Sequence, residues 1–203
     1  MITLVDYDAG NTYNLQKAFA YLGVKTNLTD DPKEILASEA IVLPGVGAFQ
    51  SAMKILKAKK LDTTLQKAAN DGIPLLGICL GMQLLFDSSS EYGITEGLHL
   101  IPGKVIELPN KKGFKIPQMG WNQNKLLKPS SEFALLENEY TYFVHSYYAK
   151  CEPEYVVSEV EYSANVPAVV QNKNVFGMQF HPEKSGHIGL EVLKTFKERI
   201  VFK

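Results

Sequence analysis

Cysteine is scarce in this chain, and long apolar runs are missing. The 203 residues include only two cysteines, Cys79 and Cys151. No apolar stretch approaches the ~20 residues that a membrane-spanning helix needs. We therefore expect neither a disulfide-stabilised fold nor a membrane protein, and we expect both thiols to be free.

The chain also lacks an excess of charge of either sign. It carries 21 Lys and Arg against 22 Asp and Glu, a net charge of -1 at pH 7. This balance argues against the basic surface that nucleic acids or anionic lipids require. The opening residues, MITLVDYDAGN, lack the basic segment and cleavage site of an export signal and are typical of a first β-strand. We therefore expect a cytoplasmic protein.

What is present is an alternation of strand and helix patterns in the first half. The length and the 45% hydrophobic content predict one soluble domain over residues 1–203. Apolar runs predict strands over residues 2–8, 24–29, 40–45 and 74–79. Helical periodicity follows each of them, over residues 14–23, a short segment after Asp31, 48–57, 61–71 and 80–86. Repeated strand–helix units predict a parallel sheet covered by helices on both faces.

The second half is rich in strand patterns. They cover residues 98–109, 140–150, 155–163 and 168–182, and the last range is predicted to form a hairpin around residues 172–174. A final helix is predicted over residues 188–201. Its apolar face consists of Ile188, Val192, Leu193, Phe196 and Ile200. The predicted fold is therefore α/β, with a central, mostly parallel open sheet flanked by helices and a strand-rich second half.

The most informative motif is Gly77-Ile78-Cys79-Leu80-Gly81, at the point where a predicted strand becomes a helix. It is the thiol version of the nucleophile elbow, a strained turn whose crowded backbone requires small neighbours. The helix N-terminus would favour a thiolate, and the Leu80 N–H would face an oxyanion. The alternative is a packing cysteine, because free cysteine is among the most buried residue types. Cys151 has no such setting, and we interpret it as a strand-end or packing thiol.

A nucleophile needs a base, and the base needs an orienting group. His181 and Glu183 follow a predicted strand, and Pro182 keeps His181 extended. Residues two apart in extended backbone point the same way, so Glu183 is expected to reach the imidazole. Alone, such a pair is typical of a surface strand end. Together with Cys79 it favours a catalytic triad.

The chain also contains three other histidines and one glycine-rich loop. His145 lies on an apolar strand, where it could line a site or simply pack, and His99 and His187 have no comparable setting. Gly45-Val46-Gly47 ends another predicted strand. Its backbone could approach a ligand and supply a second oxyanion N–H, or could be a plain turn.

Pro44-Gly45-Val46-Gly47, Gly77 to Gln83 and His181-Pro182-Glu183, in this order, resemble class I (triad) glutamine amidotransferases over nearly the whole chain. The resemblance implies a flavodoxin-like fold. It implies that Cys79 attacks the side-chain amide of L-glutamine and forms a γ-glutamyl thioester, which water hydrolyses to glutamate. His181 would deprotonate the thiol and protonate the leaving ammonia, and Glu183 would orient His181.

The resemblance also assigns the contacts of the substrate. Gln83 and Glu91 match residues that hold the α-carboxylate and α-amino groups of glutamine, together with backbone groups around Ser146 and Tyr147. The oxyanion hole would be formed by Leu80, Val46 and Gly47. No cofactor and no metal are implied. We also hypothesise that this hole is incomplete in the free subunit, because glycines 45 and 47 permit more than one peptide orientation.

Three further stretches, PQMGWN, YFVHSYY and FGMQFHPEKS, narrow the resemblance to glutaminase subunits of histidine biosynthesis. In these proteins ammonia passes through a tunnel to a (β/α)8-barrel cyclase subunit, where it enters an imidazole ring. The resemblance thus implies a heterodimer with Trp121 and Asn122 at the contact. Gln118 stands where relatives often have another polar residue, which we interpret as neutral.

Three alternatives remain open at this point. The chain could serve another acceptor synthase, such as one of a pyridoxal phosphate or nucleotide-sugar pathway. It could be a cysteine peptidase or γ-glutamyl hydrolase, although Gln83 and Glu91 suit the charged ends of a free amino acid. It could also be a binding subunit without catalysis, which the intact set of Cys79, His181 and Glu183 disfavours.

Overall fold

The computed structural model describes residues 1–8 and 10–201 of the chain. The strands are β1 (Ile2–Val5), β2 (Thr26–Thr29), β3 (Ala40–Leu43), β4 (Leu75–Ile78), β5 (Phe86–Ser89), β6 (Thr95–Glu96), β7 (Ile101–Glu107), β8 (Gln118–Leu126), β9 (Tyr140–His145), β10 (Tyr147–Lys150), β11 (Val156–Glu161), β12 (Asn165–Asn172) and β13 (Val175–Met178). The α-helices are α1 (Thr12–Tyr21), α2 (Pro32–Leu36), α3 (Phe49–Ala58), α4 (Leu61–Asn70), α5 (Leu80–Leu84) and α6 (Gly186–Thr195). Short 3-10 turns are η1 (Ala134–Leu136), η2 (Pro153–Tyr155) and η3 (Pro182–Lys184), and η4 (Phe196–Val201) continues α6 as a π-helical segment. Within the described residues, no helix has the length and apolar character needed to cross a membrane.

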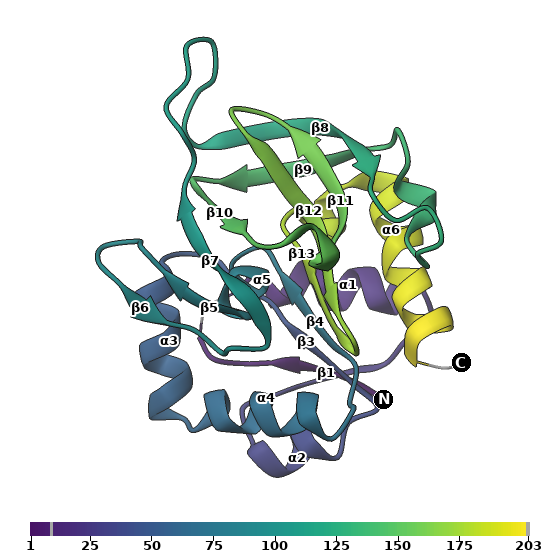
Figure 1. Ribbon diagram of the computed structural model, residues 1–203. Helices are drawn as coiled ribbons and strands as arrows, with labels where there is room; N and C mark the ends of the chain where they lie inside the picture. The colour runs from purple at the N-terminus through teal and green to yellow at the C-terminus, as the bar shows by residue number, and fades with distance from the viewer. Residues whose placement is uncertain (9, 202–203) are drawn as a thin grey trace.

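A nine-stranded sheet in the order β2-β1-β3-β4-β13-β12-β11-β8-β9 forms the centre of the molecule (Figure 1). Its first five strands pair in parallel, as the alternating strand and helix patterns predict. The remaining four join antiparallel, which requires no crossover helix. The predicted α/β class is confirmed. Strands β8, β9, β11 and β12 of the strand-rich second half form the antiparallel extension of the sheet, and β13 completes its parallel part.

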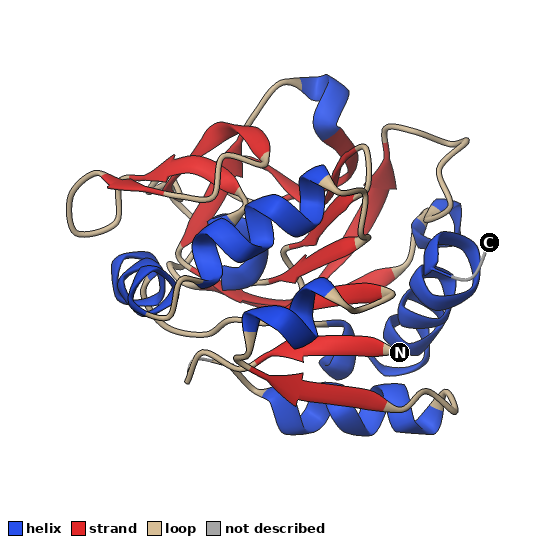
Figure 2. Ribbon diagram, turned by 90° about the horizontal axis from the view of Figure 1, so that it is seen from below, coloured by secondary structure: helices blue, strands red, loops and turns tan. Residues whose placement is uncertain are grey.

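Helices cover both faces of the parallel half (Figure 2). Successive side chains of a strand point to opposite faces, so each strand contributes to two cores. On one face α1 and α6 pack against β1, β3 and β4, through residues that include Phe19, Val192, Leu4, Val42 and Leu76. On the other face α2, α3 and α4 pack against the alternate residues, among them Ile35, Met53, Leu65, Val5 and Ile41.

A second sheet, in the order β10-β7-β5-β6, packs beside this second core. Its strand β10 follows β9 directly, although β9 belongs to the nine-stranded sheet. The run predicted as one strand over residues 140–150 is therefore broken at Ser146, whose carbonyl accepts the N–H of Leu108. The loop between β7 and β8 stands out from the body of the molecule (Figure 1).

The predicted helix over residues 80–86 is too long. Helix α5 ends at Leu84, and Phe86 begins β5 instead. The backbone carbonyls of Leu84, Leu85 and Phe86 accept N–H groups from residues 98–101, so the chain changes to strand pairing there. A short apolar run satisfies either pattern, which is why periodicity did not separate them. Strands β5, β6 and β8 were not predicted.

Most of the other elements match their predictions. The predicted hairpin is β12 and β13, joined through Lys173 at φ 53°. Asp31 caps α2 by accepting the Lys33 N–H at 2.8 Å. The predicted apolar face of the last helix is confirmed, because Val192, Leu193 and Phe196 are fully buried and Ile188 and Ile200 pack against the same core.

Candidate active site

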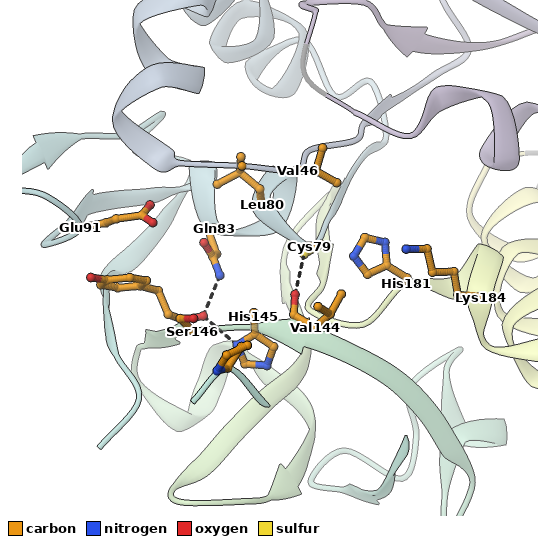
Figure 3. A pocket seen from close by; sticks show the side chains of 13 residues that line it. Val46, Cys79, Leu80, Gln83, Glu91, Val144, His145, Ser146, His181 and Lys184 are labelled. Atoms are coloured by element: carbon orange, nitrogen blue, oxygen red, sulfur yellow. Dashed lines mark hydrogen bonds between the residues drawn. The ribbon is translucent and has the colours of Figure 1, made fainter. Parts of the chain in front are cut away.

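A pocket of about 340 Å³ opens at the carboxyl ends of β3 and β4, near the point where β13 ends (Figure 3). Ligands of α/β sheets gather at this edge, where loops can carry side chains around a common space. It is lined by Val46, Gly47, Cys79, Leu80, Gln83, Glu91, Pro117, Val144, His145, Ser146, Tyr147, His181 and Lys184. The structure therefore brings most of the candidate residues predicted from the sequence around one cavity.

Cys79 occupies a strained turn between β4 and α5. Its backbone has φ 54° and ψ -110°, a conformation that non-glycine residues rarely adopt. The neighbouring glycines are required by space: a Cβ on Gly77 would lie 2.5 Å from the Gly81 carbonyl oxygen, and one on Gly81 would lie 1.9 Å from the Leu43 oxygen. This is the geometry of a nucleophile elbow. Strain of this kind persists only where surrounding packing enforces it.

Two groups approach the sulfur of Cys79 from the protein side. The thiol donates to the Val144 carbonyl at 3.9 Å, and the Nε2 of Gln179 donates to the sulfur at 3.9 Å. Helix α5 has only five residues, so the positive electrostatic potential that its N-terminus creates at the sulfur is smaller than that of a long helix. The Gln179 donor therefore adds to the stabilisation of a thiolate.

His181 and Glu183 form a buried pair beside this sulfur. The Nδ1 of His181 lies 2.8 Å from the Oε1 of Glu183, and their side chains are 4% and 1% exposed. His181 is extended, as Pro182 predicts, but Glu183 lies in the turn η3. The predicted reason for their contact, alternation along a strand, is therefore wrong. The turn itself folds the carboxylate back onto the imidazole.

The charges around His181 raise its pKa. Burial alone lowers the pKa, but interactions with the Cys79 sulfur and with Glu183 outweigh it and raise the pKa to about 9. Since Glu183 occupies Nδ1, the other ring nitrogen, Nε2, is left for the sulfur (Figure 3). The arrangement can therefore hold a proton on His181 at neutral pH, beside the sulfur.

The backbone of His181 is held by strand β9. Its N–H donates to the Tyr142 carbonyl at 3.0 Å, and its carbonyl accepts the Ser185 hydroxyl at 2.7 Å. The same Ser185 oxygen accepts the Tyr142 N–H at 3.0 Å. This closed set of bonds fixes the base relative to the sheet.

The loop after β3 forms another part of the pocket wall, near Cys79 (Figure 3). Val46 and Gly47 line the pocket, and Gly47 has φ 99°. A Cβ on Gly45 would lie 2.7 Å from the Gly81 nitrogen, so the loop is in direct contact with the first turn of α5. Leu80 opens that turn and lines the same cavity. The three residues predicted for the oxyanion hole are thus neighbours of Cys79.

The residues predicted to hold the ends of glutamine lie at the opposite side of the cavity from His181 (Figure 3). Gln83 is buried and donates to the Tyr147 carbonyl at 2.7 Å and to the Oε1 of Gln179 at 3.1 Å. Glu91 accepts the Phe49 N–H at 2.7 Å. Ser146 also lines the pocket.

The sequence patterns do not predict Gln179 as a site residue. It is fully buried and joins two predicted site residues, Cys79 through its Nε2 and Gln83 through its Oε1. A signal was available, because Gln179 stands two residues before His181. It also directly follows the end of β13, at the edge of the sheet where the other site residues gather.

The surroundings of His145, His99 and Cys151 account for these residues without a catalytic role. His145 lines the pocket and donates from Nδ1 to the Tyr147 carbonyl at 2.8 Å. Burial lowers its pKa to about 4, so this ring is neutral at pH 7. His99 pairs with Asp87 and Glu96 outside the pocket. Both cysteines are free, and burial raises the pKa of Cys151 to about 11.

Trp121 and Asn122 lie on opposite faces of β8. Trp121 is 51% exposed and packs edge to face on Tyr142 at a ring distance of 6.0 Å. The Oδ1 of Asn122 accepts the Nε2 of Gln118, which is fully buried. Of the two, only Trp121 presents its side chain prominently on the surface. No group of three or more His, Cys, Asp or Glu suited to a metal ion occurs in the described part of the chain.

Comparison with known families and proteins agrees with this geometry. The family model described as glutamine amidotransferase class-I matches residues 3–198. The chain is 56% identical over 200 residues to an imidazole glycerol phosphate synthase subunit HisH of Lactiplantibacillus plantarum, covering 98% of this chain and 96% of that protein. It is 49% identical over 198 residues to the protein of the same name from Listeria monocytogenes, with 98% and 95% coverage.

Solved structures show the same fold at low identity. A crystal structure described as a glutamine amidotransferase superposes with a TM-score of 0.78 at 15% identity and covers all of both chains. The structure of PurLQS from Thermotoga maritima gives a TM-score of 0.75 at 21% identity, covering 98% of this chain and 97% of that one.

Proposed function

Because the chain belongs to the class-I glutamine amidotransferase family, we propose that it is the glutaminase subunit of an imidazole glycerol phosphate synthase, active in histidine biosynthesis. The relatives that carry this name match it over nearly their whole length at about half of all positions. The proposal treats residues 1–203 as one glutamine amidotransferase domain, which the match over residues 3–198 supports. A cytoplasmic location stays a prediction.

The observation that carries the proposal is the buried His181–Glu183 pair beside Cys79 on its strained turn. In the first step the Cys79 thiolate attacks the side-chain amide carbon of glutamine. The C–N bond then breaks, and His181 gives its proton to the leaving ammonia. The product is a γ-glutamyl thioester on Cys79. A positively charged His181, held by Glu183, suits this step.

The second half of the reaction reverses these roles. His181, now neutral, takes a proton from water, whose oxygen attacks the thioester carbonyl. The C–S bond breaks, glutamate leaves, and the Cys79 thiolate and protonated His181 are restored. In both halves the negative oxygen would be stabilised by N–H groups of Leu80 and of the segment at Val46 and Gly47. Gln83 and Glu91, with backbone groups of Ser146 and Tyr147, would hold the charged ends of the substrate.

The ammonia requires a partner that uses it. We propose a heterodimer with a (β/α)8-barrel cyclase subunit, docked on the outer face of β8 and β9. Met119, Trp121 and Tyr140 are each more than half exposed on this face, which suits an interface with aromatic anchors. Asn122, on the opposite face of β8, would support this contact by holding the strand in place. The hypothesis that the oxyanion hole is incomplete without the partner belongs to this proposal.

Glutamate release tests the proposal directly. The purified chain is incubated with glutamine alone, and then with the cyclase and its nucleotide substrate, and glutamate is measured enzymatically. We expect release that rises strongly with the complete complex. Equal rates with and without the partner would refute the incomplete hole, and no glutamate from either sample of folded protein would refute the function. Activity only with another synthase would assign a different acceptor.

The variant Cys79→Ala identifies the nucleophile. Loss of a catalytic nucleophile typically lowers kcat by ~10⁴-fold or more, because no covalent intermediate forms. We expect no glutamate above background, while the complex with the cyclase still forms on a sizing column. Substantial residual turnover in this variant would contradict the role of Cys79.

A further inference from the structure

We propose that Tyr7 and Glu91 are positioning residues that clamp the two ends of the segment from Pro44 to Phe49 beside Cys79. This inference rests on the proposed function, in which that segment supplies part of the oxyanion hole. Neither residue acts on the reacting atoms through this clamp. Each instead holds the backbone that presents N–H groups to them.

Tyr7 holds the first end. Its hydroxyl donates to the Pro44 carbonyl at 2.7 Å, and the residue is only 1% exposed. Burial, and secondarily Cys79, raises the pKa of Tyr7, so its hydroxyl stays a donor at all working pH values. Pro44 is itself buried, so without this hydroxyl its carbonyl would lose a partner inside the protein. A buried carbonyl without a partner is costly, so the bond fixes the orientation of this peptide.

Glu91 holds the second end. Its Oε2 accepts the N–H of Phe49, the first residue of α3, at 2.7 Å. A carboxylate bound to a helix N-terminal amide gives a strong, charge-assisted hydrogen bond. Ser89 supports Glu91 in turn, by accepting its N–H at 3.1 Å. The start of α3 is thereby attached to the loop after β5.

Only four residues lie between the two clamped groups: Gly45, Val46, Gly47 and Ala48. A Cβ on Gly45 would lie 2.7 Å from both the Tyr7 hydroxyl and the Gly81 nitrogen, so this end has no room to shift. Gly47 at φ 99° has open space around it. The clamp therefore confines any movement of the segment to the peptide units around Val46 and Gly47, next to Cys79.

Glu91 also links this segment to the substrate. Its side chain lines the pocket (Figure 3), and its Oε1 is not used by the bond to Phe49. A carboxylate can accept on both oxygens at once. The α-ammonium group of glutamine would bind the same carboxylate that holds the segment, so occupation of the pocket stiffens the clamp.

Tyr7→Phe tests the first end, because it removes one hydroxyl and keeps the ring. We expect kcat for glutamine in the complete complex to fall about 10-fold, less than the 10²–10³-fold loss of an oxyanion donor itself, with KM within about twofold. Tyr162→Phe is the matched control. It removes a hydroxyl that donates to the Lys115 carbonyl at 2.7 Å, outside the pocket, and should leave both constants unchanged.

Two substitutions of Glu91 test the second end. Glu91→Gln keeps an oxygen for the Phe49 N–H but removes the charge, so we expect KM to rise about 10-fold or more while kcat stays within about threefold. Glu91→Ala loses both, and we expect the same rise in KM with a further 10-fold fall in kcat. Recovery of kcat by the conservative variant is a result that general destabilisation would not produce.

The outcomes separate the clamp from the function on which it rests. If the wild-type complex releases no glutamate, the proposed function fails. If the wild type is active but Tyr7→Phe retains its kcat, or Glu91→Gln and Glu91→Ala have equal kcat, the clamp is wrong and the function stands. Should Tyr7→Phe fail to fold by circular dichroism, the pair of Glu91 variants decides alone.

Discussion

The sulfur of Cys79 has a hydrogen-bond acceptor and a donor as neighbours, the carbonyl of Val144 and the side-chain amide of Gln179. The acceptor favours the thiol and the donor favours the thiolate. Gln179 also holds Gln83, which we assign to the substrate. Under the proposed function, one buried amide would therefore serve both the nucleophile and the binding of glutamine.

Gln179 gives a prediction that separates these two contacts. Gln179→Leu removes both, and we expect kcat/KM for glutamine to fall by ~10- to 100-fold, the value of a hydrogen bond to a charged group. Gln179→Glu keeps an acceptor for Gln83 but places a negative charge beside the sulfur. Its KM should stay near that of the wild type, while iodoacetamide should alkylate Cys79 more slowly. Faster alkylation in Gln179→Glu would contradict the assigned contact.

Two buried histidines make stability depend on pH in opposite directions. Burial lowers the pKa of His145 from 6.5 to about 4, so its contribution is present above pH 6.5 and is lost as pH falls. For His181, burial is outweighed by Cys79 and Glu183, and the pKa rises from 6.5 to about 9, so its contribution is present below pH 6.5 and is lost as pH rises. We expect the free energy of unfolding to be largest near pH 6.5 and to fall by at most about 1.4 kcal/mol for each pH unit on either side.

Urea unfolding at about pH 5, 6.5 and 8.5 measures this dependence. His145→Asn should flatten the acid side of the profile, and His181→Asn should flatten the alkaline side. Each variant serves as the control for the other. An alkaline loss that persists unchanged in His181→Asn would show that another group causes it.

At the scale of elements, the connection from β4 to α5 depends on space more than on helix propensity. Leu80 to Leu84 form only five helical residues, and all of them are buried. The helix N-terminus rests on the end of β3, where the Leu43 carbonyl occupies the position that a Gly81 side chain would take. The elbow is therefore stable only while both glycines beside Cys79 are retained.

Gly81→Ala should accordingly be severely destabilising. Overpacking costs typically 1–3 kcal/mol, and we expect about 3 kcal/mol or more because the clash at 1.9 Å is with backbone. Gly113→Ala is the comparison. It has φ 94° but nothing near its Cβ position, and we expect a loss of only about 1 kcal/mol. Urea midpoints measure both, and equal losses would show that space around Gly81 is unimportant.

The sequence predicted helices and strands well where a single hydrophobic pattern, continuous or helical, covered the whole element. The parallel strands 40–45 and 74–79 and the helices 48–57 and 61–71 agree with β3, β4, α3 and α4 to within a few residues. Phe86 was misplaced and β5 missed, because local periodicity does not contain the pairing with residues 98–101. The roles of Gln179 and Tyr7 could not be predicted from the sequence for a related reason. Their roles come from partners about 40 to 100 positions away in the chain.

At the scale of the whole molecule, the outer face of β8 and β9 is the proposed docking surface for the cyclase. It is antiparallel, lies at the end of the nine-stranded sheet and reaches the pocket through Val144. Met119 and Trp121 are more exposed there than is usual for large apolar side chains. A surface of this kind is expected to lose its solvent contact when a partner binds.

Trp121→Ala tests this surface. A buried aromatic anchor typically contributes about 2 kcal/mol or more, so we expect the Kd for the cyclase to rise about 30-fold or more. Tyr21→Ala is the control, because Tyr21 is exposed at the end of α1, away from β8 and β9. This end of α1 lies beside the C-terminal helical segment, where Lys197 donates a hydrogen bond to the carbonyl of Leu22. Titration calorimetry measures both, and an unchanged Kd for Trp121→Ala would place the interface elsewhere.

Strand β9 sets the distance between the pocket and this outer face. Val144 lines the pocket, and Tyr142, two positions earlier on the same side of the strand, packs on Trp121. Two residues of a strand span about 7 Å. Tyr142 is half-buried, so one side-chain position along β9 separates the pocket wall at Val144 from the surface near Trp121. A partner docked on this face, as proposed, would cover Tyr142 and Trp121 within two strand residues of the pocket, and the path of ammonia to its acceptor would be short.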